Sequence, residues 1–570
     1  MGPARTETTA QRATREAGDP PRRFRLRSPD TVALAVIAAA FLLPLRGLLG
    51  APGAPMEEGF MLVFPERVLA GDIPNKDFLH LYGPGSLWVL AAIYKVFGTT
   101  LVTERLFGLL QEVSVVLAIY FIARRWGRTT GLSCALVSLI IIVEPHGIVA
   151  MPWVGAIALG LWGIVAGVAS RDEGDSRRGR WMALVSGLLF GLALLYRIDL
   201  VVAVVLAAVA LAGGVSTAVR KRFALGLVIG LSPYLIHVAT AGVENVVQGM
   251  LIDPVVHLRG GRALPIPPNW NVFDSAVQFV ADFIKLDWPI PRLDGPAQIF
   301  LWFFGLLASL ALLAGVAIWV VRRDHASMRA RVLLAAAGFS VGLVPQALQR
   351  PDPTHLAWVA CVGMAFVPVA VVELIQGRRP DWGRRRLAFW VGAVYLVGLA
   401  LVIPNYTLRS YADFTAQTFG EHVDSHPMRN AGRTFYNGNE PNARAANKML
   451  KVVEEITEPG ERLFVGTKDL RKTPLSEASF YFLLPQLTPS TYYIEMDPGI
   501  ANAPDSGLAD EVRSSDILIL SSTWEIWDEP NDSRKFGPNE PNEVVRDEFC
   551  LVDKFGPHYY LYRRCREGSR

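Results

Sequence analysis

Residues 177–222 have the sequence RRGRWMALVSGLLFGLALLYRIDLVVAVVLAAVALAGGVSTAVRKR. Two apolar runs, about 181–197 and 199–218, lie between clusters of arginine and lysine, and Arg197 and Asp199 stand where the runs meet. About 20 apolar residues are enough for a helix to cross the roughly 30 Å hydrocarbon core of a bilayer. The stretch therefore predicts a transmembrane hairpin whose two basic ends lie on the same side of the membrane.

The same pattern occupies most of the chain before residue 405. Of its 570 residues 51% are hydrophobic and 19% charged, which is too apolar for an ordinary soluble enzyme. The formal net charge of +4 comes from scattered arginine clusters between apolar runs, so it indicates topology and not a nucleic-acid surface. The predicted fold class is a polytopic helical membrane protein of about eleven spans, near 31–49, 103–123, 130–149, 150–169, 181–197, 199–218, 223–241, 297–321, 331–349, 355–376 and 387–404.

Arginine clusters give the orientation, because basic loops stay in the cytoplasm. One cluster precedes the first span, and further clusters follow every second span. This predicts a cytoplasmic tail over 1–30, a transmembrane region over 31–404 and an outer location for 405–570. It also predicts a first outer loop over 50–102, in which 85–98 is a surface helix, and a large outer loop over 242–296. The clusters begin with Arg22, Arg23, Arg25 and Arg27 and continue with Arg124, Arg125 and Arg128, and later ones stand near 171–180, 220–222, 322–331 and 378–386.

The first apolar run has a second interpretation. A basic region precedes it and small residues follow it, as in a secretory signal. Its apolar core is longer than the usual 7–15 residues, which favours an uncleaved anchor.

Residues 405–570 have turn clusters and short apolar runs in place of long ones. A helical stripe over 442–456 and buried strands at 463–465 and 517–520 predict a soluble α/β domain. Cys550 and Cys565 lie on two β-rich runs that flank Phe555-Gly556-Pro557-His558, and a hairpin there would bring them together. We expect a disulfide in an oxidising compartment; the alternative is two unpaired strand thiols.

Ionisable side chains at the mouths of membrane spans are functional candidates. On this topology they all fall on the outer face. The first outer loop contributes the acids Glu57 and Glu58, and the remaining candidates are Asp72, Lys76, Asp77, His80, Arg197, Asp199, Arg259, Arg262, Arg350, Asp352 and His355.

This set of acids and cations suits transfer of a sugar from a lipid phosphate. A carboxylate would take the proton of the acceptor hydroxyl, and cations would hold the phosphate as charge gathers on its leaving oxygen. Arginine and lysine can stabilise a monophosphate without a metal ion. No tight His/Cys metal spacing occurs, although several outer carboxylates could hold a divalent cation such as Mg²⁺ or Mn²⁺.

The first outer loop resembles the GT-C superfamily of membrane glycosyltransferases, which use polyprenyl-phosphate sugars. The resemblance is carried by Glu57-Glu58-Gly59, Glu66-Arg67, Ala70-Gly71-Asp72-Ile73-Pro74, Lys76-Asp77-Phe78, Tyr82-Gly83-Pro84-Gly85, Val96-Phe97-Gly98 and Arg105-Leu106. It implies a many-span core followed by an outer soluble domain, with an acidic residue just past the first span as the base. It also implies that the Pro/Gly-rich stretch leads into surface helices that shape the substrate entrance, so Tyr82 in that stretch is a candidate for substrate contact. Members often have Asp-Glu-Gly or an Asp-x-Asp pair where this chain has Glu57-Glu58-Gly59, so either glutamate is a candidate base.

The sequence leaves simpler roles open for these residues. Glu57 and Glu58 suit the start of a surface helix, where acids favour the helix dipole. Arg197 and Asp199 could form a structural pair between two spans, and Arg259 and Arg262 could belong to an ordinary basic loop. Tyr82-Gly83-Pro84-Gly85 could be a plain turn. The junction between two spans could be capped by Arg350, Asp352 and His355.

The sequence hypothesis is therefore a plasma-membrane glycosyltransferase. It would move a hexosyl or pentosyl unit from a polyprenyl-phosphate donor to an envelope glycan, lipid or protein. A transporter or flippase is the first alternative, disfavoured because transporters usually place polar residues at the midplane in two related halves. A non-catalytic envelope scaffold is the second, and it is distinguished by whether the first-loop carboxylates point into a membrane-facing cavity.

Overall fold

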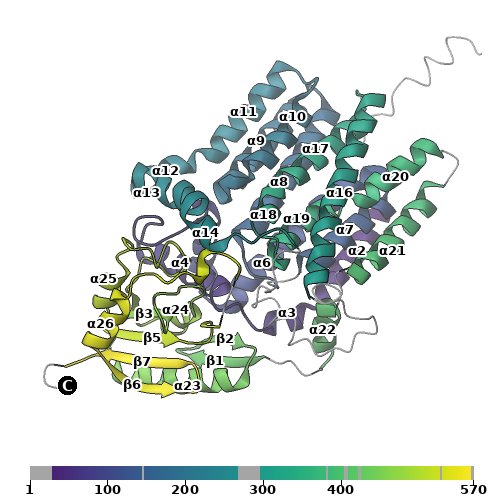
Figure 1. The fold of residues 1–570 in the computed structure, drawn as a ribbon. Coiled ribbons are helices and arrows are strands. Elements are labelled where there is room, and N and C mark those ends of the chain that lie inside the picture. Colours follow the sequence, from purple (N-terminus) through teal and green to yellow (C-terminus); the bar gives the residue numbers. More distant parts are fainter. Residues whose placement is uncertain are drawn as a thin grey trace, which may run out of the picture.

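The structure is a computed structural model that describes residues 28–143, 147–267, 295–325, 327–379, 383–402, 409–421, 425–526 and 529–566. The arginines of the N-terminal tail and much of the large outer loop lie outside these residues. Helices make up most of the described chain before residue 403, and strands that form sheets occur after residue 425 (Figure 1). The predicted fold class, a helical membrane region followed by an α/β region, is confirmed.

The helical region begins with elements that the sequence places in and around the first outer loop. These are α2 (Ser28–Leu42), α3 (Leu45–Gly50), α4 (Glu57–Ala70), α5 (Pro84–Phe97), α6 (Leu101–Ala123) and η1 (Arg124–Trp126). The next group is α7 (Arg128–Ile142), α8 (Pro152–Glu173), α9 (Arg177–Tyr196), η2 (Ile198–Leu200), α10 (Val201–Ala212), α11 (Thr217–Leu231), α12 (Pro233–Ala241), α13 (Val243–Val247), the π-helix η3 (Gln248–His257) and α14 (Leu258–Arg262). The last group is α16 (Gly295–Arg323), α17 (Met328–Gly342), α18 (Val344–Gln349), α19 (Pro353–Gly363), α20 (Val367–Arg378) and α21 (Arg384–Val402).

Each predicted span contains one or two helices, although the helices within 130–149 and 199–218 end at Ile142 and Ala212. Among the described residues, 8 helical stretches are long and apolar enough to cross a membrane, so this is a multi-pass membrane protein. Helices α7 and α10 are apolar but shorter, as is α5, the predicted surface helix. The predicted count of eleven crossings is not confirmed by these lengths. The eight stretches are Asp30–Gly50, Leu101–Trp126, Pro152–Glu173, Arg177–Tyr196, Thr217–Ala241, Ile299–Arg323, Met328–Gln349 and Pro353–Arg378.

The basic loops of different hairpins meet at one end of the helices. Arg125 forms an ion pair with Asp172, which joins η1 to the end of α8. Arg171 Nη1 donates to the carbonyls of Leu211 and Gly213, 2.6 and 2.7 Å away, at the end of α10. A Cβ at Gly213 would lie 2.8 Å from Arg331 Nη1, in α17. Arginines that are far apart in sequence are therefore neighbours, as expected if these loops share one side of the membrane.

The C-terminal region packs at the opposite end of the helices (Figure 1). Its five-stranded sheet has the order β4-β3-β5-β7-β6, with β3 parallel to β4 and β5 and with β7 antiparallel to β5 and β6. The predicted strands at 463–465 and 517–520 are β3 and β5, and the predicted helix is α23. The elements are α22 (Arg409–Thr418), β1 (His426–Asn430), β2 (Arg433–Asn437), α23 (Glu440–Ile456), β3 (Arg462–Thr467), α24 (Ser479–Leu483), β4 (Thr488–Pro489), α25 (Leu508–Arg513), β5 (Ile517–Ser521), η5 (Asp532–Arg534), α26 (Glu540–Glu548), β6 (Phe549–Phe555) and β7 (Tyr559–Arg564).

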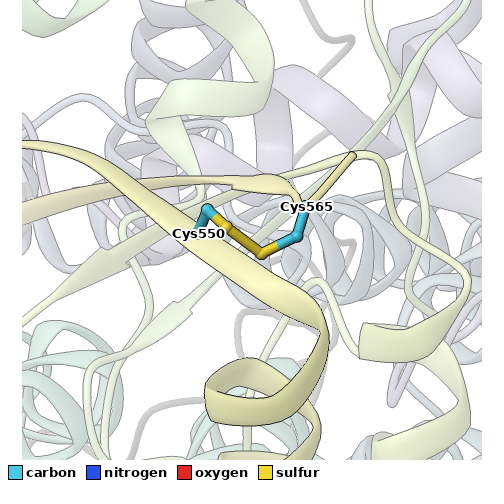
Figure 2. Close-up of a disulfide and its surroundings, with 2 residues drawn as sticks. All are labelled: Cys550 and Cys565. Carbon is cyan, nitrogen blue, oxygen red and sulfur yellow. A yellow bond between two sulfur atoms is a disulfide. The ribbon is translucent and has the colours of Figure 1, made fainter. Parts of the chain in front are cut away.

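A disulfide joins Cys550 to Cys565 across the last hairpin (Figure 2). Strands β6 and β7 pair antiparallel around the expected turn, where Gly556 has a φ of 59° that favours glycine. Cys550 lies on β6, and Cys565 directly follows β7. The two remaining cysteines, Cys134 and Cys361, are buried free thiols in the helical region.

The C-terminal region is held against the first outer loop. Arg433 in β2 forms an ion pair with Glu66 in α4. The backbone N–H of Ser479 donates to the carbonyl of Pro55 at 3.0 Å. Gly59 permits this approach, because a Cβ there would lie 2.6 Å from the Ser479 nitrogen. The amide of Leu79 likewise donates to the carbonyl of Tyr492 at 2.8 Å. The start of α4, and with it Glu57, is thus fixed between the two regions.

Candidate active site

A cavity of about 420 Å³ lies where the helical and C-terminal regions meet. It draws side chains from the start of α4, the α9–α10 junction, the η3–α14 segment, the α18–α19 junction and the loop after β4. Most of the ionisable candidates from the sequence face it. The ionisable and aromatic side chains in its lining are Glu57, Tyr82, Arg197, Asp199, Arg262, Arg350, Asp352, His355, Trp358, Glu495 and Asp497.

Glu57 and Glu58 have different environments. Glu57 lines the cavity, and no hydrogen bond or ion pair to it occurs within the described residues. Glu58 is fully buried and receives two hydrogen bonds from Arg105, Nε to Oε1 at 2.7 Å and Nη2 to Oε2 at 2.9 Å. Arg105 Nη1 also donates to the carbonyls of Leu48 and Leu49. Glu58 thus ties α4 to α6 and α3, while the Glu57 carboxylate faces the space where a substrate would bind.

Arg197 and Asp199 form a pair at the α9–α10 junction. Arg197 Nε and Nη2 donate to the two oxygens of Asp199, at 3.0 and 2.7 Å. The guanidinium carbon also lies 4.4 Å from the centre of the Tyr82 ring and 5.0 Å from that of Trp153. Such cation–π contacts hold the guanidinium plane in place. These contacts hold the α9–α10 junction together, and both side chains also line the cavity.

Arg350, Asp352 and His355 form a connected group at the α18–α19 junction. Arg350 Nε lies 2.5 Å from Asp352 Oδ2, and Arg350 also binds Glu529 in the C-terminal region. Asp352 caps α19 by accepting from the His355 amide, and its oxygens lie 2.9 and 3.0 Å from His355 Nδ1. Burial alone would raise the pKa of Asp352, but His355 and Arg350 hold it well below its usual range. An ionised Asp352 fixes the His355 ring through Nδ1, and no hydrogen bond to Nε2 occurs within the described residues.

Two acids of the C-terminal region, Glu495 and Asp497, were not among the sequence candidates. Arg262 Nε donates to Asp497 Oδ1 at 2.8 Å. The other oxygen of Asp497 and the Oε2 of Glu495 are buried without a hydrogen-bond partner. Burial, followed by repulsion from Asp497, raises the pKa of Glu495 well above its usual range. The available sequence signal was two acids around Met496 in an otherwise apolar and aromatic stretch.

Besides Glu58, five sequence candidates lie away from the cavity lining. Asp72 pairs with Arg67 at 2.7 Å, and Asp77 Oδ2 accepts from the Ile73 amide at 2.7 Å, so both stabilise the loop after α4. Lys76 and Arg259 are exposed. His80 is buried behind Tyr82, with their ring centres 5.6 Å apart, and burial lowers its pKa to about 3.

One side of the cavity is apolar and reaches the outside of the helices. Ile198 and Val201 line it from the α9–α10 junction, and Leu251 and Val255 line it from η3. All four are also exposed on the protein surface, at 38–62% of their area. A contiguous exposed apolar surface on a multi-pass membrane protein is suited to contact with lipid. The cavity therefore extends from buried charged groups to exposed apolar side chains.

Carboxylates are numerous in the cavity, but they do not make a recognisable metal site. Within the described residues there is no group of three or more His, Cys, Asp or Glu side chains placed to hold a metal ion. Each of these acids instead forms an ion pair with an arginine or has no arginine partner.

The chain matches no protein-family model and no curated protein. Among solved structures it is similar to ArnT from Cupriavidus metallidurans bound to undecaprenyl phosphate, with a TM-score of 0.48 and 16% identity over 94% of this chain and 98% of that chain. ArnT from the same organism in the apo state gives a TM-score of 0.45 at 16% identity over 94% of this chain and 98% of that chain. The Archaeoglobus fulgidus oligosaccharyltransferase in complex with Zn and sulfate gives 0.47 at 12% identity, over 92% of this chain and 72% of that chain. These likenesses name no substrate for this chain.

Proposed function

We propose that this protein is a membrane glycosyltransferase that moves a sugar from a polyprenyl-phosphate donor to a hydroxyl of a cell-envelope glycan, lipid or protein. The observation that carries the proposal is the two-sided character of the cavity. Charged groups such as Arg197 and Arg350 line one part, and surface-exposed apolar side chains such as Val201 and Val255 line another. A ligand that satisfies both has a charged head on a long apolar chain, as a lipid phosphate does.

In this proposal Glu57 is the general base. Its carboxylate takes the proton of the acceptor hydroxyl as the acceptor oxygen bonds to the anomeric carbon. The bond from that carbon to the phosphate oxygen breaks, and the lipid phosphate leaves. The absence of a protein partner for Glu57 among the described residues supports this role, because a base must be able to reach the substrate. Glu58 is unsuited to it, because Arg105 occupies both of its oxygens.

Arg197, Arg262, Arg350 and His355 would surround the phosphate. Each arginine already has a carboxylate partner, so the arginines' charges are partly neutralised before a ligand binds. Burial raises the pKa of Glu495 well above its usual range and raises that of Asp497 as well. Protonation of Glu495 would reduce the negative charge of the cavity and so favour an anionic head, while Asp497 stays paired with Arg262. His355 Nε2, oriented through Nδ1 by Asp352, is a suitable donor to a phosphate oxygen.

Sidedness supports an outer-face reaction. The basic loops meet at the end of the helices opposite the C-terminal region, and basic loops stay in the cytoplasm. The cavity and residues 405–570 would then face outward. A first-loop carboxylate that lines a cavity with a lipid-facing side also favours an enzyme over a non-catalytic scaffold.

The test is turnover by the full-length protein in lipid nanodiscs. Polyprenyl-phosphate sugars, both hexosyl and pentosyl, are supplied with envelope extracts as acceptors, and release of lipid phosphate is measured. Glu57→Gln should lower kcat at least a hundredfold, because it removes the base but keeps the shape of the side chain. Glu244→Gln is the matched control, since Glu244 is exposed and lies outside the cavity.

Both variants should unfold at the wild-type temperature. Full activity in Glu57→Gln would rule out its role as the base, and failure of the wild type with every lipid-phosphate donor would overturn the proposed function.

A further inference from the structure

The loop that carries Glu495 and Asp497 belongs to the C-terminal region but lies inside the cavity. Three neighbours hold it there. The Leu79 amide and the Arg67 side chain bind the carbonyls of Tyr492 and Thr491, at 2.8 and 3.0 Å, and Ser476 Oγ donates to the Ile494 carbonyl at 3.0 Å. Gly261 packs against the same loop, since a Cβ there would lie 2.4 Å from the Pro498 carbonyl oxygen. The position of the two acids is therefore fixed by the fold.

Two of the carboxyl oxygens have no partner. Glu495 and Asp497 are 6% and 2% exposed, and Glu495 Oε2 and Asp497 Oδ2 make no hydrogen bond within the described structure. A buried polar atom without a partner costs about 1–3 kcal/mol, so such atoms are rare unless a ligand completes them. Both residues line the cavity, so a bound ligand is in a position to reach these oxygens.

The surroundings favour hydroxyl groups over a cation as that ligand. A metal ion needs several ligands, and no group of three suitable side chains exists among the described residues. Arg262 already neutralises Asp497, and burial raises the pKa of Glu495 well above its usual range, which favours its neutral form, a hydrogen-bond donor as well as an acceptor. Tyr82 and Trp358 add aromatic surface to the same cavity, and aromatic rings present an apolar face to a sugar ring.

From this geometry we infer that Glu495 and Asp497 bind ring hydroxyls of a sugar, so that the C-terminal region determines which sugar the cavity accepts. This rests on the proposed function for the identity of the cavity, and it adds a specificity site that is separate from the base Glu57. The sugar is either the one on the donor or the one on the acceptor, and both offer the same hydroxyl chemistry.

The experiment measures binding and does not require turnover. Full-length protein in nanodiscs is titrated with the methyl glycosides of mannose, glucose, galactose and arabinose and with their monodeoxy forms, followed by saturation-transfer NMR. The same sugars as decyl phosphate esters form a second arm. In the wild type, at least one parent sugar should bind, and removal of one particular hydroxyl should weaken binding about tenfold.

Three variants separate the possible roles. Glu495→Met removes hydrogen bonding at similar size and should reduce that discrimination to less than threefold. Glu495→Gln keeps a neutral donor and acceptor and should preserve most of it. Glu477→Met is the matched control, because Glu477 is a buried carboxyl of the same region with an unpartnered oxygen but lies outside the cavity.

Discrimination seen with methyl glycosides assigns the site to the acceptor sugar, and discrimination confined to the phosphate esters assigns it to the donor sugar. Wild-type protein that binds none of the sugars, or Glu495→Met that discriminates like the wild type, overturns the inference. Equal loss in Glu495→Met and Glu495→Gln, or binding that requires Mg²⁺, would mean a cation site instead. If the protein turns over a lipid-phosphate sugar but shows none of this hydroxyl discrimination, the proposed function stands and the inference is refuted.

Discussion

Adjacent residues in the first turn of α4 have separate roles because successive side chains of a helix point about 100° apart. Glu57 therefore faces the cavity while Glu58 faces α6, where Arg105 binds it. The sequence predicted that an acid just past the first span would matter, but it left both glutamates as candidates. Which glutamate remains free to act as the base depends on which one Arg105 binds. Arg105 lies 47 positions after its partner Glu58 in the chain.

The Glu58–Arg105 pair should be important for stability. Glu58→Gln leaves Arg105 buried without its counter-charge, and breaking a buried ion pair costs about 3–5 kcal/mol. We expect a clear fall in unfolding temperature in nanodiscs, followed by tryptophan fluorescence. The double variant Glu58→Met with Arg105→Met should recover most of the loss, because it removes both charges. A Glu58→Gln protein as stable as the wild type would contradict a structural role for this pair.

Glu477 should make stability depend on pH. Burial raises its pKa to about 7, while an unfolded glutamate titrates near its usual value of about 4.3. The folded chain then holds more protons between these values, so the free energy of unfolding falls as pH rises from about 4 to 7. The change is on the order of 3 kcal/mol. Glu477→Gln should be more stable than the wild type at pH 8 and similar to it at pH 4, measured by urea unfolding; an unchanged pH profile would refute this.

The η3–α14 segment brings charge and apolar surface together. Its π-helix lines the cavity with Leu251 and Val255, and Arg262 at its end binds Asp497. The sequence predicted only a large outer loop here. Its apolar run is interrupted by Pro254, and the helix is held by contacts with the C-terminal region, which no local pattern reveals.

Gly261→Ala should disturb the cavity without touching any of its charges. The new Cβ would lie 2.4 Å from the Pro498 carbonyl oxygen, so the loop bearing Glu495 and Asp497 must move. A 1 Å displacement of positioning groups can cost about a hundredfold in rate, so we expect a fall in kcat/KM of ten- to a hundredfold. Gly305→Ala is the control, because a Cβ at Gly305 meets nothing within 4 Å. Equal activity of the two variants would show that this contact is not needed.

Long apolar runs, charge clusters and short strands were visible in the sequence because each is a local pattern. The spans, α23, β3, β5 and the final hairpin all follow from such patterns. The cavity does not, because it forms where residues near positions 57, 197, 262, 350 and 495 meet in space. Asp72, Asp77 and His80 look like the other candidates in sequence, yet they serve the loop's own packing.

Orientation across the membrane can be tested on the whole molecule. The two free cysteines are buried and the other two form a disulfide, so introduced cysteines should dominate labelling. Arg220→Cys lies in the basic first turn of α11, and Glu525→Cys lies on the exposed surface of the C-terminal region. An impermeant maleimide should label Glu525→Cys in intact cells and Arg220→Cys only after permeabilisation. The reverse pattern would place the cavity on the cytoplasmic side.

The apolar side of the cavity, between Ile198 and Val201 at the α9–α10 junction and Leu251 and Val255 on η3, would allow the chain of the proposed donor to stay among its neighbours in the bilayer. Each methylene that remains there avoids a transfer to water worth about 0.8 kcal/mol. Encounter between protein and donor is then a two-dimensional diffusion problem. The quantity that saturates the reaction is the mole fraction of donor in the membrane, so dilution with inert lipid should slow it while dilution with buffer should not.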